Sequence, residues 1–90
     1  MTPVNAIDLL GYKPRAKQWW IFELKRGRPT DAVAGQVSRY LGWLRSERDQ
    51  DVRGAIIARQ ADNKLRFAVQ ANAALEAWVF HDGFRLERVA

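Results

Sequence analysis

Apolar and polar positions along the chain form short runs that predict a sheet. Val4–Leu10, Trp19–Lys25, Gly54–Arg59 and Leu75–Phe80 are apolar or aromatic segments of strand length, with turn-forming residues between them. Phe84–Val89 alternates as a final strand does, and the Asp-Gly pair before it favours a hairpin turn. The pattern therefore predicts five strands.

Between the second and third predicted strands, the apolar positions recur with the spacing of one helix face. They are Val33, Val37, Tyr40, Leu41 and Leu44. Thr30 is the expected N-cap of this helix, which ends near Arg48. Within it, we expect Gly35 and Gly42 to allow close packing on the sheet.

The segment Asp62–Asn72 fits both helical and strand spacing, and we favour a helix that is capped by Asp62. The resulting order, β-β-α-β-α-β-β, predicts an α/β fold with a small mixed sheet and one main packed helix. At this length, residues 1–90 are expected to form a single domain.

The strand Trp19–Lys25 carries the first candidate chemistry. Alternate residues of a strand point to opposite faces, so Glu23 and Lys25 share one face. We expect the other face to be the one that packs on the core, because its residues are Trp20, Phe22 and Leu24.

An antiparallel pairing of the first two strands that sets Leu10 opposite Ile21 also brings Asp8 opposite Glu23. Opposed side chains have Cβ atoms about 4.5–5.5 Å apart. Two carboxylates at that separation repel each other unless a cation lies between them, and Mg²⁺ readily accepts one or two carboxylates. This register therefore favours a divalent metal site.

Lys25 could orient a water molecule and neutralise the charge that develops on a phosphate. Gln36, in the second turn of the helix, could reach the same edge of the sheet, and Tyr40 follows one turn later. The chemistry is thus distributed over Asp8, Glu23-Leu24-Lys25 and Gln36-x3-Tyr40.

This ordered series resembles the PD-(D/E)XK nuclease superfamily. Over Ile7–Leu44, and again at RGAIIA (53–58), the sequence is similar to the C-terminal nuclease domain of the EndoMS/NucS group of DNA endonucleases. The resemblance implies that Asp8 and Glu23 bind Mg²⁺ or Mn²⁺, with the Leu24 carbonyl as a further ligand. It also implies that Lys25 is the catalytic lysine, that Gln36 supports the site and that Tyr40 lies near it.

The charge of the chain favours a polyanionic partner. Lys and Arg number 15 against 10 Asp and Glu, a net charge of +5. Arg26, Arg28 and Arg39 are candidates for gripping DNA phosphates, with Tyr40 beside them. The high content of aromatic residues leads us to expect a homodimer.

The chain has no cysteine and a single histidine, His81. These counts exclude a disulfide framework, a thiolate zinc site, a cysteine nucleophile and a two-histidine metal site. No apolar run approaches the roughly 20 residues that span a bilayer, and no secretory signal is recognisable, so a cytoplasmic location is expected.

The sequence thus predicts a metal-dependent DNA endonuclease domain that hydrolyses phosphodiester bonds. The alternative is a non-catalytic module that keeps the nuclease fold with an incomplete site and binds nucleic acid or assembles with other chains.

Overall fold

The computed structural model describes residues 9–27 and 29–90, which form five strands and two helices in the predicted order. In chain order they are β1 (Leu9–Lys13), β2 (Gln18–Lys25), α1 (Ala32–Glu47), β3 (Asp51–Ala58), α2 (Asn63–Gln70), β4 (Leu75–His81) and β5 (Arg85–Arg88). The α/β fold class is confirmed. Most of the strand predicted at Val4–Leu10 lies outside the described residues, and β1 continues to Lys13 through residues that were expected to form a loop.

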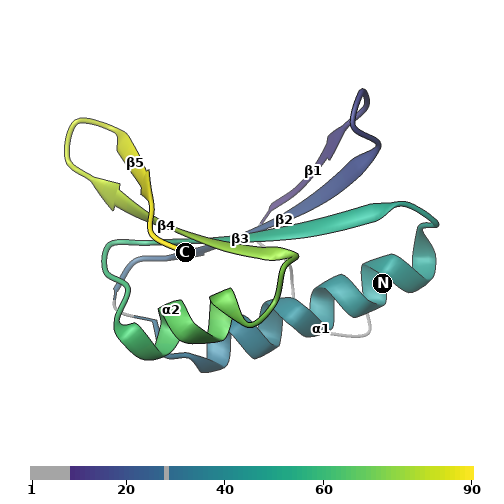
Figure 1. Ribbon diagram of the computed structural model, residues 1–90. Helices are drawn as coiled ribbons and strands as arrows, with labels where there is room; N and C mark the ends of the chain where they lie inside the picture. The colour runs from purple at the N-terminus through teal and green to yellow at the C-terminus, as the bar shows by residue number, and fades with distance from the viewer. Residues whose placement is uncertain (1–8, 28) are drawn as a thin grey trace.

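The strands form one mixed sheet in the order β1-β2-β3-β4-β5. The three central strands, β2, β3 and β4, run parallel to one another, and an outer strand pairs antiparallel with the central group at each end. Leu10 pairs with Ile21, which is the predicted register. Because crossovers between parallel strands are right-handed, two crossovers that advance in the same direction place their helices on the same side. Figure 1 shows α1 and α2 together on one side of the sheet.

The core lies between the helices and the sheet face that they cover. The predicted face of α1 is buried there, against Ile21, Ile56 and Val52 of the sheet among others. The prediction that Trp20, Phe22 and Leu24 form the core-facing side of β2 is wrong. Ile21 and Glu23, on the other side, are only 0% and 3% exposed, while Leu24 is 54% exposed. The helices cover the side of β2 that carries its glutamate.

The two helices begin differently. The N-cap of α1 is Asp31, whose side chain makes no capping hydrogen bond, so the expected cap at Thr30 is wrong by one residue. At α2 the expected cap is confirmed, since the Asp62 carboxylate accepts a hydrogen bond of 2.9 Å from the Leu65 amide.

Close packing on the sheet depends on Gly54 of β3. A Cβ at this position would lie 2.8 Å from Val37 Cγ1 and 2.9 Å from Leu75 Cδ2, whereas one at Gly42 would meet nothing within 4 Å. A Cβ at Gly35 would meet only Arg39 Nη1, at 3.8 Å, so the role expected of Gly35 and Gly42 in close packing is wrong.

Gly54→Ala is expected to lower the free energy of unfolding by about 1–3 kcal/mol, because the added methyl overpacks the contact between α1, β3 and β4. Gly42→Ala is the matched control and is expected to raise that free energy by up to ~1 kcal/mol, because alanine favours an exposed helix. Urea denaturation followed by circular dichroism measures both. Equal effects of the two substitutions would contradict this packing.

Candidate active site

The candidate site lies where β2 ends beside its parallel neighbour β3. Ligands of open α/β sheets commonly bind outside the carboxyl ends of parallel strands. A hollow of about 450 Å³ opens here between the end of β2 and the first turns of α1. Lys25, Gln36 and Arg39 all line it. The fold thus brings together three of the predicted residues from two elements.

Glu23 is the buried acid of this site. Its Oε1 lies 3.1 Å from Lys25 Nζ, and the side chains of Glu23 and Lys25 are 5% and 36% exposed. Its Oε2 is buried and has no hydrogen-bond partner in the described part of the chain. A carboxylate oxygen left unpaired in a dry environment is costly, and it is a donor that hard cations such as Mg²⁺ prefer. The residues present therefore fit a divalent cation.

Gln36 is held in place by Tyr40. The Gln36 side-chain amide donates a hydrogen bond of 2.9 Å to the Tyr40 hydroxyl. Tyr40 is only 1% exposed and belongs to the core, so its hydroxyl holds Gln36 and its ring does not form a DNA-binding surface.

A second hollow, of about 300 Å³, adjoins the site on the other side of Lys25. Arg26 and Arg59 line it together with Lys25. Arg59 also lies 5.4 Å from the centre of the Phe80 ring and 3.3 Å from Asp82 Oδ1. Sequence reasoning missed Arg59, although its place directly after the strand that pairs with Glu23-Leu24-Lys25 was a usable signal.

Three further features of the site remain predictions. Asp8 and Arg28 lie outside the described residues. The Leu24 carbonyl belongs to the main chain between Glu23 and Lys25. The Leu24 side chain points away from these two residues, and Leu24 is 54% exposed. Over residues 9–27 and 29–90, no three His, Cys, Asp or Glu side chains gather into a metal-binding cluster. A cation at Glu23 would therefore need further ligands, such as Asp8, the main chain, water or a phosphate.

No helix in the described ranges is long and apolar enough to cross a bilayer.

The sheet with its two crossovers, and the buried acid beside a lysine at the carboxyl ends of the strands, are features of a nuclease-related α/β domain. Sequence comparison specifies the family. Residues 1–77 match the endonuclease NucS C-terminal domain, and the chain belongs to this family.

A curated relative supports that assignment. The chain is 34% identical over 59 residues to endonuclease NucS of Methanopyrus kandleri. The alignment covers 66% of this chain and 22% of the relative, so the chain spans a small part of that protein's length. No solved structure matches the chain significantly.

Proposed function

We propose that the domain is a Mg²⁺- or Mn²⁺-dependent DNA endonuclease of the PD-(D/E)XK type. The observation that carries the proposal is the buried, unpartnered Oε2 of Glu23 beside the Lys25 ammonium. The family to which the chain belongs is described as the C-terminal domain of an endonuclease, which supports the same class of reaction. The net charge of +5 suits a polyanionic substrate.

In this proposal Glu23 and Asp8 hold the cation, with the Leu24 carbonyl as a further ligand. The pairing of Leu10 with Ile21 is the register that permits Asp8 to lie opposite Glu23. When bound, the cation supplies Lewis-acid stabilisation of negative charge on the phosphate.

Lys25 orients the attacking water and stabilises the negative charge that develops on the phosphoryl oxygens. The attacking water loses one proton to solvent as its oxygen bonds to phosphorus, one P–O ester bond breaks, and the leaving alkoxide takes a proton from solvent. Gln36, fixed by its hydrogen bond to Tyr40, positions Lys25 or the water at the edge of the hollow. Arg26, Arg28 and Arg39 bind the neighbouring phosphates, and a substrate that contacts several such cations binds in a salt-dependent way.

Incubation with plasmid, flap and mismatched DNA tests the proposal. We expect cleavage with Mg²⁺ or Mn²⁺ and none with EDTA. The contrary result would be that the protein binds DNA but cleaves no substrate with either metal, and that Glu23→Ala leaves its affinity for DNA unchanged. That result would identify a non-catalytic nucleic-acid-binding module and refute the proposal. A homodimer and a cytoplasmic location remain predictions.

A further inference from the structure

The sheet face turned away from α1 and α2 carries a group of aromatic side chains. Trp20 and Phe22 of β2 and Trp78 of β4 lie on it, outside the core that the helices cover. Trp20 and Phe22 are nearly parallel, with an angle of 18° between their planes and 6.0 Å between ring centres. Flat, partly exposed rings of this kind offer surfaces on which another planar ring can stack.

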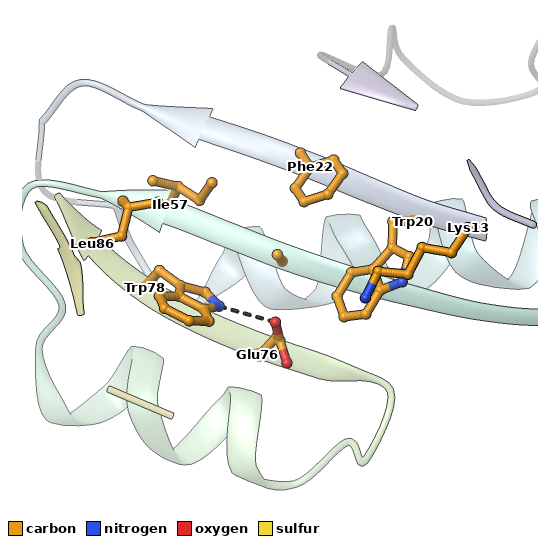
Figure 2. A pocket seen from close by; sticks show the side chains of 8 residues that line it. Lys13, Trp20, Phe22, Ile57, Glu76, Trp78 and Leu86 are labelled. Atoms are coloured by element: carbon orange, nitrogen blue, oxygen red, sulfur yellow. Dashed lines mark hydrogen bonds between the residues drawn. The ribbon is translucent and has the colours of Figure 1, made fainter. Parts of the chain in front are cut away.

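A hollow of about 260 Å³ lies among these rings. It forms because Ala55, between Phe22 and Glu76 in the sheet register, has a side chain too small to fill the space above β3. Figure 2 shows Trp20 and Trp78 standing on opposite sides of this hollow. The space is therefore walled by aromatic rings and has an alanine floor.

Two charged groups complete the hollow. Glu76 accepts a hydrogen bond of 3.0 Å from Trp78 Nε1 and lies 3.2 Å from Arg88 Nη1. The Glu76 carboxylate has further lone pairs that can accept hydrogen bonds from a ligand. The Lys13 ammonium lies 5.1 Å from the centre of the Trp20 ring. A planar ligand that carries N–H donors and is attached to an anion matches this combination.

We propose that this hollow binds one unpaired base of a DNA strand, stacked on the tryptophan rings, with Glu76 accepting a hydrogen bond from the base and Lys13 pairing with the adjacent phosphate. The choice of DNA rests on the proposed function. The hollow is nevertheless a separate site, because Glu23 lies on the helix-covered face of the sheet. A polyanionic strand is favoured over a second copy of the chain, since each copy carries a charge of +5.

The test compares a fluorescently labelled single-stranded oligonucleotide with an abasic strand of the same length, in EDTA so that no cleavage occurs. We expect the strand with bases to bind the 90-residue chain more tightly in fluorescence anisotropy. Trp78→Leu is expected to weaken binding of that strand by about five- to a hundredfold, the range for loss of one base–aromatic stack, and to leave the abasic strand unaffected.

Trp78→Phe keeps a ring and is expected to retain most of the preference for bases. Phe67→Ala is the matched control, because Phe67 is a 67% exposed aromatic residue of α2. Thermal melting verifies that each variant is folded, and Trp20→Leu replaces Trp78→Leu if that variant does not fold.

Equal affinity for the two strands would overturn the inference. It would also be overturned if light scattering showed a wild-type dimer that Trp78→Leu converts to a monomer, with no preference for bases, because the face would then bind a second copy. Neither result affects the proposed function, which is measured separately as metal-dependent cleavage of duplex DNA. Conversely, if the chain cleaves no DNA but still binds the strand with bases more tightly than the abasic strand, the base-binding site is supported and the proposed function is not.

Discussion

Glu23→Gln is expected to lower the rate of metal-dependent DNA cleavage by roughly 10²–10³-fold or more, the loss that follows removal of one preorganised electrostatic group. The amide keeps the shape of the carboxylate but cannot supply its negative charge to a cation. Gel assays of plasmid nicking over a range of Mg²⁺ and Mn²⁺ concentrations measure the effect. Full activity of Glu23→Gln would show that the buried acid has no part in cleavage.

The same substitution is expected to stabilise the fold in EDTA by about 0.5–2 kcal/mol, as replacements of strained active-site groups commonly do. The native carboxylate is buried with an unpartnered oxygen, and a neutral amide is less costly to bury than a charged carboxylate. Lys25 is exposed enough to be solvated without its partner. Glu47→Gln, at an exposed acid of α1, is the control and should change neither cleavage nor melting temperature. A lower melting temperature for Glu23→Gln would contradict this account.

Lys25→Ala is expected to reduce cleavage by about 10²–10³-fold while DNA binding changes only a few-fold. The ammonium acts on the developing charge of the reacting phosphate, whereas overall affinity depends on many cations. Anisotropy in EDTA measures binding, and single-turnover assays measure cleavage. Lys64→Ala removes an exposed lysine of α2 and serves as the matched control.

Lys25→Arg should restore part of the activity at most, because a planar guanidinium does not present its charge as a compact ammonium does. If binding and cleavage fall in parallel in Lys25→Ala, the lysine is a binding residue and its catalytic role is refuted.

The parts of the fold that local signals determine were predictable. The antiparallel register that the sequence permitted between the first two strands, with Leu10 opposite Ile21, is the one that the hairpin adopts. The cap at Asp62 resolved a segment whose apolar spacing fitted both a helix and a strand, since its side chain offers the Leu65 amide a partner. At the site, the proximity of Lys25 and Gln36 followed from a short connection between β2 and α1.

The parts that depend on distant segments were not predictable. Three large apolar side chains on one side of β2 suggested that this side faces the core, but the crossovers through α1 and α2 determine which face is covered. The start of β3 was missed for a similar reason. Asp51 joins the sheet opposite Gln18, whose amide donates a hydrogen bond of 2.8 Å to its carboxylate. That hydrogen bond is also the main cause of the lowered pKa of Asp51.

The strand order also determines where the sheet can grow. In the described part of the chain, β1 and β5 are the outer strands, and each presents unpaired main-chain groups on one side. Three of the four residues of β5 are charged, which discourages strand addition, whereas β1 has a single charge at its end, Lys13. A polypeptide that extends the sheet by β-augmentation would therefore pair with β1, and β1 alone would separate it from β2, the strand that carries Glu23 and Lys25.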